Sequence, residues 1–249
     1  MRRVRGHELF IQLHGIFESE NTIYMVLEYI DGTPLLDLCD MEVFPESKRL
    51  PILDQMLQAL KILQKKRLVH RDLKPDNIML TASGEVKVID FGLCLIDSED
   101  QAVLRAGTPG FIAPEVLQST HKRTTLFNIS TDLFAVGVIY YCMATAEHPF
   151  DADDADGVLA NNRNGFISFN IDKKRCLNTF GKLELELIKM ILQPTQETRS
   201  SVDKSILYVN RMLDDQLETQ TRSETGSKIS ITRRPNRTKL AYSPSHFKQ

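Results

Sequence analysis

The stretch LVHRDLKPDNIML, residues 68–80, places a dense set of polar side chains between two apolar runs. Asp72, Lys74 and Asn77 lie close together in it, and Asp90 follows the next apolar run, VKVI. Carboxylate and amide oxygens suit a hard cation such as Mg²⁺, and an ammonium group stabilises developing negative charge. One such acid alone is more often a turn or cap residue, but their joint pattern indicates chemistry.

Three short motifs stand in a fixed order along the chain. They are HRDLKPDN at residues 70–77, DFG at 90–92 and APE at 113–115. Asp90 lies thirteen residues after Asn77, and Glu115 lies twenty-five after Asp90. This set resembles the signature of eukaryotic-type protein kinases, and three agreeing motifs are far more specific than any one. The resemblance covers about residues 9–213.

The resemblance implies a role for each polar residue of the first motif. Asp72 matches the acid that accepts the proton of the substrate hydroxyl, and Lys74 would lie near the transferred phosphoryl group. Asn77 and Asp90 match the two metal-binding positions. The implied cofactors are therefore ATP and Mg²⁺, and the implied partners are protein substrates.

The apolar run TIYMVLEYI resembles the kinase strand that leads to the hinge, where adenine binds. Leu27 then lies at the gatekeeper position. The backbone C=O of Glu28 and N–H of Ile30 would bond the base, and Met79 would lie under its ring. A plain strand and a core methionine remain the alternative for these residues.

The substrate class follows from two features of the motifs. Lys74 in DLKPDN, together with Thr108 in the loop GTPGF, resembles serine/threonine kinases rather than tyrosine kinases. The stretch NISTDLFAVGVIYYCMATAEHPF further resembles the calcium/calmodulin-dependent-like branch, which does not by itself indicate calmodulin binding.

Five further residues match structural positions of the same family. His70 and Phe91 would pack in a spine that links the two lobes. Glu115 and Arg199 match an ion pair that ties the activation segment to the helical lobe. Asp132, in STDLF, matches the residue that holds the backbone of the catalytic loop.

The expected activation loop departs from the common pattern. Arg71 is of the type that receives a phosphate on this loop, but Leu104 stands where the phosphorylated threonine is usual. Ser98, in the acidic patch DSED, is the only hydroxyl residue between Leu93 and Ala106. Either the acids of this patch offset the positive charge of Arg71 without phosphorylation, or Ser98 is phosphorylated. The third alternative is that the acidic patch simply faces solvent.

The pattern of elements predicts an α+β fold, with strands first and mostly helices after. FIQLHGIF and TIYMVLEYI read as a hairpin, residues 49–66 as a helix with Pro51 in its first turn, and NIML and VKVID as two short strands joined by a turn at Gly84. Further helical segments are expected at 116–118, 131–145, 155–161, 182–192 and 201–213, the last with Ser201 as a candidate N-cap. Residues 1–30 would be a remnant of the small lobe and the start of the hinge, 31–213 the helical lobe, and 214–249 a disordered basic tail.

Several parts expected of a kinase are not in the sequence. It contains no GxGxxG, no strand lysine in a VAIK-like run and no room for the helix glutamate that pairs with it. The hairpin resembles only the last two of five small-lobe strands, so Thr22–Glu28 would present an unpaired apolar edge that favours aggregation.

Three hypotheses follow from this mixture of present and missing parts. The chain is a serine/threonine kinase sequence without its N-terminal portion, and the complete catalytic loop favours this. Alternatively, it is a truncated pseudokinase-like binding or scaffolding module, as the missing phosphate grip suggests. A small-molecule kinase is the third hypothesis, and the substrate-type loop GTPGFIAPE disfavours it.

Composition excludes several other classes of protein. The 249 residues carry a formal net charge of -2, which predicts no general binding of nucleic acid. The longest apolar stretch, Leu133–Ala146, is shorter than the ~20 residues of a membrane span. The four cysteines form no CxxC pair, so neither a zinc site nor a disulfide framework is expected. We therefore expect an intracellular, cytoplasmic protein with reduced thiols.

Overall fold

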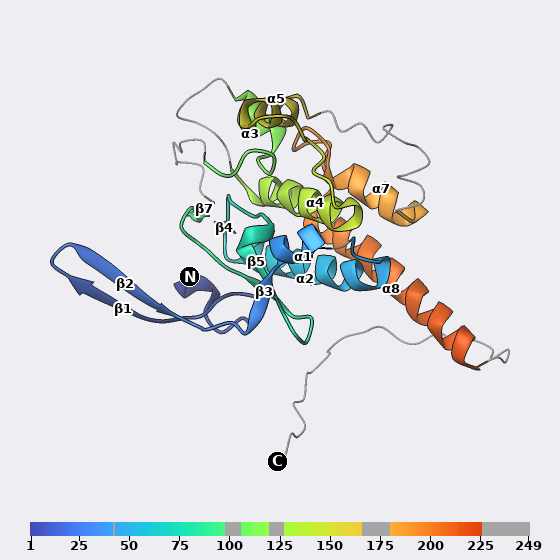
Figure 1. Cartoon of the computed structure of the whole chain (residues 1–249), viewed down its shortest axis with the longest axis horizontal. Coiled ribbons are helices and arrows are strands. Elements are labelled where there is room, and N and C mark those ends of the chain that lie inside the picture. Colours follow the sequence, from blue (N-terminus) through green and yellow to red (C-terminus); the bar gives the residue numbers. More distant parts are fainter. Residues whose placement is uncertain (42, 98–105, 120–126, 166–179, 226–249) are drawn as a thin grey trace, which may run out of the picture.

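The computed structural model describes residues 1–41, 43–97, 106–119, 127–165 and 180–225. In this part of the chain a strand hairpin extends away from a mainly helical body, so the fold is α+β as predicted (Figure 1). The strands are β1 (Leu13–Ser19), β2 (Thr22–Leu27), β3 (Gly32–Pro34), β4 (Leu68–Val69), β5 (Ile78–Thr81), β6 (Val86–Val88) and β7 (Leu95–Ile96). The helices are α1 (Leu35–Met41), α2 (Glu46–Lys65), α3 (Pro114–Gln118), α4 (Ile129–Thr145), α5 (Ala155–Asn164), α7 (Lys182–Ile191) and α8 (Val202–Thr225), with 3-10 turns at Arg2–Val4 and Pro75–Asn77.

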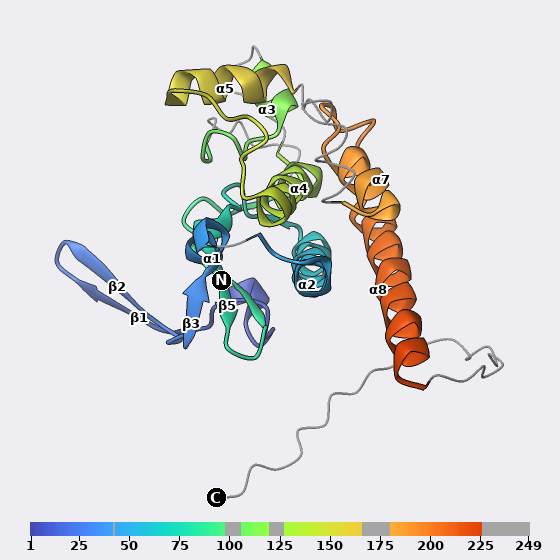
Figure 2. The ribbon, with the colours of Figure 1, turned by 45° about the vertical axis from the view of Figure 1, so that its right-hand side comes forward.

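The hairpin of β1 and β2 is antiparallel, with Leu13 opposite Leu27 and Ser19 opposite Thr22. Every residue of β2 is exposed, and Figure 2 shows both strands standing clear of the body. The exposed apolar side chains on and just beyond the hairpin are Ile16, Phe17, Ile23, Tyr24, Met25, Val26, Leu27 and Tyr29. A two-stranded sheet with both faces in water gains little from apolar burial, so its own packing stabilises it only marginally.

The second sheet has the order β3-β5-β6 and lies against the helical body. The tight turn between β5 and β6 contains Gly84 at φ +82°, a conformation that glycine adopts without steric cost. On the other edge of β6, Ile11 N–H bonds the Val88 carbonyl at 3.0 Å, and Val88 N–H bonds Leu9 O at 2.8 Å. Phe10 and Val4 are buried in the same hydrophobic core as the helices, so these two side chains anchor the segment before β1 on the body.

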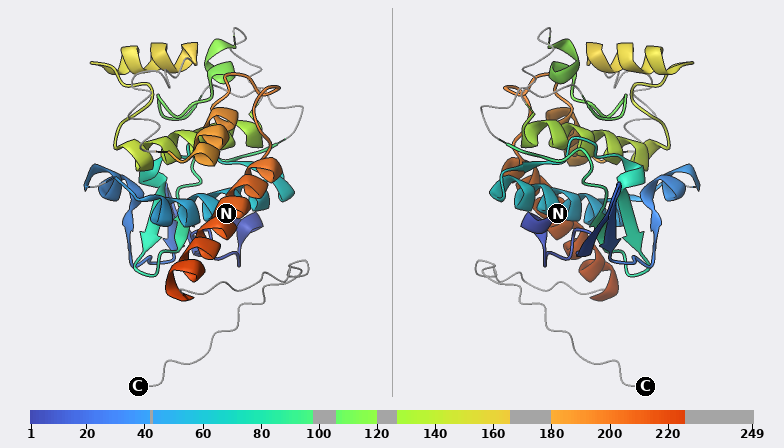
Figure 3. Two further views of the ribbon diagram at one scale, coloured as in Figure 1. Left: turned by 90° about the vertical axis from the view of Figure 1, so that its right-hand side faces the viewer. Right: turned by 90° about the vertical axis from the view of Figure 1, so that its left-hand side faces the viewer.

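The helical body is built around α2 and α4. Helix α4 is buried on nearly its whole circumference, as expected of a helix that is apolar all round. Its N-cap is Asn128, whose side chain accepts the Ser130 N–H, and its C-cap Ala146 is in the left-handed conformation at φ 53°. Figure 3 shows α8 crossing the face of α2 that lies away from the hairpin. Within the described residues, no helix is both long and apolar enough to cross a membrane.

A buried polar network ties α2 to α4 and α7. The Arg49 guanidinium donates to both carboxylate oxygens of Glu184, at 2.9 and 2.8 Å, and also to the Phe44 carbonyl at 2.7 Å. The Tyr140 hydroxyl donates to the same carboxylate. Arg49 and Glu184 are 4% and 1% exposed, so the ion pair and its hydrogen bonds take the place of water around both charges.

The structure differs from the sequence predictions in four places. Helix α2 starts at Glu46, which puts Pro51 in its second turn rather than the first, with the loss of one backbone hydrogen bond. Strand β3 and helix α1 occupy the segment DGTPL and its continuation, although Gly and Pro in this segment are typical of a break. Strand β7 lies within the expected activation loop.

The fourth difference concerns the end of the helical lobe. Ser201 Oγ accepts the Lys204 N–H at 3.2 Å, as a cap should. However, α8 continues to Thr225, so residues 214–225 of the predicted disordered tail are helical. Residues 226–249 lie outside the described part of the chain.

The buried network makes a stability prediction. Replacing Glu184→Ala leaves the Arg49 charge buried without its carboxylate, and we expect a loss of about 3–5 kcal/mol in the free energy of unfolding. Urea denaturation followed by circular dichroism measures this. The matched control is Glu186→Ala, an exposed acid of the same helix, which should change stability by less than about 0.5 kcal/mol. A double variant, Arg49→Met with Glu184→Leu, should recover most of the lost stability. Equal losses in Glu184→Ala and in the control Glu186→Ala would contradict the prediction.

Candidate active site

The polar loop at residues 70–77 lies between β4 and β5, and the first turn of α4 supports it. Asp132 is buried and its carboxylate accepts two backbone N–H groups, from His70 at 2.7 Å and from Arg71 at 2.9 Å. Arg71 is held at φ 73°, a conformation that costs energy for a residue with a side chain. Asp132 therefore fixes a strained backbone just before Asp72.

Asp72 lies at the centre of a polar cluster. Thr108 Oγ1 donates to Asp72 Oδ1 at 2.7 Å. The Asn77 amide donates to the Asp72 carbonyl at 2.8 Å and to Oδ2 at 3.3 Å, and Lys74 Nζ lies 3.7 Å from Oδ2. Asp72, Lys74 and Asn77 of the loop after β4 are thus brought together with Thr108, which the sequence had assigned to the substrate-type loop before α3.

Asp90 reaches the same region through the pairing of β5 with β6. The Ile89 N–H bonds the Asn77 carbonyl at 2.9 Å, so Asp90 follows directly on a residue paired with Asn77. Asp90 is exposed, has φ 55°, and accepts the Gly92 N–H on Oδ1 at 3.0 Å.

The residues present fit a Mg²⁺ ion held jointly with phosphate. The amide nitrogen of Asn77 is bound to Asp72, which leaves its oxygen as the atom for a cation, and Asp90 offers a carboxylate. Within the described residues no group of three His, Cys, Asp or Glu could hold a metal on its own. That is compatible with Mg²⁺, which binds one or two protein oxygens and completes its shell with phosphate and water.

A cluster of three aromatic rings links this site to the N-terminal residues. The ring of Phe91 lies 5.1 Å from the ring of His70 and 5.9 Å from that of Phe10, measured between centroids. His70 is fully buried, its Nε2 bonds the Ile89 carbonyl at 3.0 Å, and burial lowers the pKa of its imidazole. Sequence reasoning missed Phe10, although an apolar residue just before the first strand could have indicated it.

Arg71 and the activation-loop residues are only partly described. The Arg71 guanidinium stacks 4.4 Å above the Phe127 ring, and its Nη1 lies 3.4 Å from the Leu93 carbonyl. Burial lowers the pKa of Arg71, against the opposing charge of Asp132. Ser98 and Leu104 lie outside the described residues.

Glu115 and Arg199 form a two-bond ion pair, with N–O distances of 2.6 and 2.8 Å. Arg199 also donates to the Gln193 and Ser130 carbonyls and stacks 5.0 Å from the Phe134 ring. The pair joins the start of α3 to the segment before α8, and so fixes the end of the loop that carries Thr108.

The loop around Thr108 has a second support that sequence reasoning missed. Asn162 on α5 is buried and accepts the Gly110 N–H at 3.1 Å, while its amide donates to the Ile112 carbonyl at 2.8 Å. The Phe111 ring packs edge-on against His148, with centroids 5.1 Å apart. An asparagine in a polar helix such as ANNRN gives no sequence signal that marks it as buried.

The residues matched to adenine binding lie where β2 passes into β3. Leu27 is 37% exposed and Ile30 is 9% exposed. The Glu28 N–H bonds the Gln12 carbonyl at 2.9 Å, and the Glu28 carboxylate accepts the Gln12 N–H at 3.0 Å and lies 2.7 Å from Lys87 Nζ. Although burial opposes it, Lys87 keeps the Glu28 pKa lowered. Met79 on β5 pairs with Pro34 of β3, so the strand that follows Asn77 leads back to this segment.

Comparison with known proteins gives one family. The protein kinase domain family matches residues 1–208 of the chain. A probable myosin light chain kinase of Dictyostelium discoideum is 37% identical over 158 residues, which are 62% of this chain and 50% of that protein. The death-associated protein kinase of Caenorhabditis elegans is 34% identical over 166 residues, 65% of this chain and 11% of that protein. Serine/threonine-protein kinase 17A of Oryctolagus cuniculus is 29% identical over 205 residues, 80% of this chain and 50% of that protein.

The chain therefore belongs to the protein kinase domain family. Within that family it is a catalytic domain of the eukaryotic serine/threonine type. The family uses ATP with a divalent cation and acts on protein substrates. The chain spans half or less of the length of these three relatives.

The buried Asp132 predicts a pH dependence of stability. Burial raises the pKa of Asp132 to about 7, against the two backbone hydrogen bonds that favour its carboxylate. An acid whose pKa is higher in the folded state contributes stability below its unfolded pKa of about 3.9, and this contribution is lost as the pH rises towards 7. We expect Asp132 to add a slope of up to about 1.4 kcal/mol per pH unit in that window. The lowered pKa of His70 acts in the opposite direction, so stability from that group grows as the pH rises.

Comparison with Asp132→Asn isolates the contribution of this one group, because His70 is common to both proteins. The variant loses one of the two backbone bonds and should be less stable at every pH, but its stability should fall less between pH 5 and pH 7. Urea denaturation at both pH values gives the two differences. The same pH dependence in both proteins would show that Asp132 does not titrate in this range.

Proposed function

We propose that this domain transfers the γ-phosphate of Mg²⁺-bound ATP to serine or threonine hydroxyls of protein substrates. The observation that carries the proposal is the cluster of Asp72, Lys74, Asn77 and Thr108, whose polar atoms meet at 2.7–3.7 Å around one carboxylate. Phosphoryl transfer needs positioned charges more than covalent chemistry, and this cluster supplies them. We place the reaction in the cytoplasm, where ATP and reduced thiols coexist.

In this mechanism each residue acts at a stated atom. Asp72 accepts the proton of the substrate hydroxyl, and the Thr108 bond holds its Oδ1 in place. Lys74 places its ammonium beside the transferred group, where it offsets developing negative charge. Asn77 and Asp90 would hold Mg²⁺, which shields the phosphates and orients them. Leu27, Glu28, Ile30 and Met79 would hold the adenine.

A second function is favoured by the exposed hairpin. The 249 residues contain no Gly-rich loop and no VAIK-like lysine to grip the phosphates, and β2 is exposed along its length. On these grounds the chain by itself would transfer phosphate weakly, and it would serve as a binding or scaffolding module. The expected deficit is several kcal/mol of transition-state stabilisation, because phosphate contacts are electrostatic terms of that order.

A chimera separates the two functions. We expect purified 1–249 to transfer radiolabelled phosphate from ATP to a generic protein substrate at a rate close to background. Replacing residues 1–8 by the Gly-rich loop, strand lysine and helix glutamate of a serine/threonine kinase should raise that rate by at least about a hundredfold, because the missing phosphate contacts are restored.

The matched control is the same chimera with Asp72→Ala, which should return to background. Robust transfer by 1–249 that is lost in Asp72→Ala would contradict the expected weakness of the chain alone. A chimera that melts cooperatively and binds ATP but transfers nothing would favour the scaffolding function instead.

We further propose that acids near Arg71 replace activation-loop phosphorylation. Asp97 follows β7, and its N–H bonds the Arg67 carbonyl at 2.9 Å, so the acidic patch begins beside the catalytic loop. In the active chimera, Ser98→Ala should change the rate by less than about twofold, because the acids, and not a phosphate on Ser98, would offset the charge of Arg71. Intact-mass measurement should show Ser98 unmodified. Loss of most activity in Ser98→Ala, with Ser98 phosphorylated in the parent protein, would replace this proposal by phosphorylation control.

A further inference from the structure

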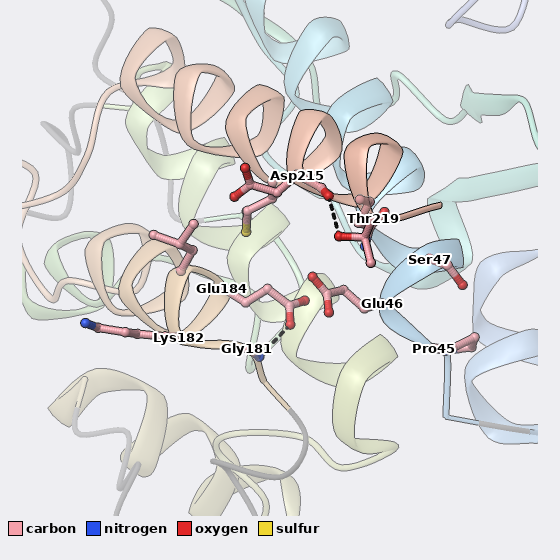
Figure 4. Close-up of a pocket in the computed structure, with 11 residues that line it drawn as sticks. Pro45, Glu46, Ser47, Gly181, Lys182, Glu184, Asp215 and Thr219 are labelled. Atoms are coloured by element: carbon pink, nitrogen blue, oxygen red, sulfur yellow. Dashed lines mark hydrogen bonds between the residues drawn. The ribbon is translucent and has the colours of Figure 1, made fainter. Parts of the chain in front are cut away.

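A groove lies where the first residues of α2 and α7 approach the flank of α8 (Figure 4). It has a volume of about 630 Å³. Pro45, Leu183 and Met212 form apolar parts of its wall, and Asp215, Gln216 and Thr219 line it from α8. The proposed kinase chemistry uses none of these residues.

The charged groups of the groove are mostly acidic. Figure 4 shows the carboxyl groups of Glu46 and Glu184 turned towards each other, whereas the ammonium of Lys182 points away from them. Glu184 is already neutralised by Arg49, and burial together with Glu184 raises the pKa of the Glu46 carboxyl. On the rim, Asp215 is exposed, as are its neighbours Asp214 and Glu218 on α8.

These carboxylates decide which kind of occupant fits. Two helices begin at the groove, and bare helix N-termini attract anions. Here Glu184 accepts the Gly181 N–H at 2.8 Å, so an acid of the chain already occupies the start of α7. A further anion would meet Glu46 and Asp215, whereas a cationic segment with apolar side chains would complement both the rim and the walls.

The sequence that follows α8 has this composition. Residues 226–249 contain six basic residues and no acidic one. The part nearest to the helix, GSKISITRR, alternates Ile229 and Ile231 with polar residues and ends in Arg233 and Arg234. Such a segment can place isoleucines on an apolar wall and guanidinium groups at a carboxylate rim.

The length of this segment is sufficient to reach the groove. From Thr219, which lines the groove, to Thr225 at the end of α8 the helix rises by about 9 Å. The six residues 226–231 can span up to about 20 Å when extended. The first of them is Gly226, a residue type that tolerates the backbone conformations in which a chain reverses direction.

We propose that residues 228–234 of this chain dock in the groove between the N-termini of α2 and α7 and the flank of α8. Ile229 then lies beside Thr219, and Ile231 reaches the apolar wall around Leu183 and Met212. Arg233 and Arg234 pair with Glu46 and Asp215. The segment thereby becomes an integral part of the helical body instead of a solvated tail.

Endoproteinase Lys-C tests this docking on the full chain, because it cleaves after Lys228, inside the docked segment, and after Lys239, beyond it. Intact mass follows both cuts in one sample, so the Lys239 cut is an internal reference. In the double variant Glu46→Arg with Asp215→Arg, cleavage after Lys228 should accelerate about fivefold or more relative to Lys239, since cleavage tracks the open population. Neither arginine creates a new cleavage site.

Two further variants keep the test independent of folding and of overall charge. Arg233→Glu with Arg234→Glu changes only the segment and should accelerate the Lys228 cut to a similar extent. Combined with the groove variant, it should restore slow cleavage, because the charges are exchanged. The matched control is Asp153→Arg with Glu197→Arg, two exposed acids outside the groove, which should leave the ratio unchanged.

An unchanged ratio of the two cuts in the groove and segment variants would overturn the proposal. So would equal acceleration by the control variant, which would indicate a general charge effect. Protection of Lys228 that rises with protein concentration would show that a second copy provides the groove, and the docking within one chain would then be wrong.

Discussion

The two hydrogen bonds from His70 and Arg71 to the buried Asp132 carboxylate are the constraint on which the candidate site depends. They hold a backbone that would otherwise relax, because Arg71 has a positive φ. Asp132 can do this only because α4 is buried almost all round and cannot shift. Helices α2 and α7 pack against α4, and α8 packs against both of them, so the apolar core of the body ultimately fixes the direction in which Asp72 points.

The other buried charges work in the same way, each joining segments that are far apart in the sequence. Arg49 meets Glu184 across 135 residues, and Arg199 meets Glu115 across 84. A buried charge without its partner is strongly unfavourable, so each pair permits only one arrangement of the elements that carry it. The first pair sets α7 against α2, and the second sets the Thr108 loop against the base of α4.

The sequence predicted the elements with a clear period and the residues with a motif. Helices α2 and α7 follow from apolar spacing and α4 from an unbroken apolar run, and Asp72, Lys74 and Asn77 lie close together within one motif. Strands β3, β4 and β7 have only two or three residues, too few for any period, and exist because a partner strand is present. Asn162 gave no signal, because its role arises from burial against segments that are remote in sequence, and Phe10 offered only its place in the apolar run FIQLHGIF.

The hairpin and the body are therefore stabilised by different forces. Phe10 and Val4 share the core of the helices, whereas β1 and β2 expose their apolar side chains and connect to β6 through the Glu28–Lys87 ion pair. The hairpin packs on few neighbours, yet Asp132, His70 and Phe91 keep their arrangement. The bond of His70 to Asp132 and the ring contact of His70 with Phe91 do not involve β1 or β2. The geometry of the catalytic loop is thus independent of the hairpin, and in the proposed function only the grip on the nucleotide depends on further strands.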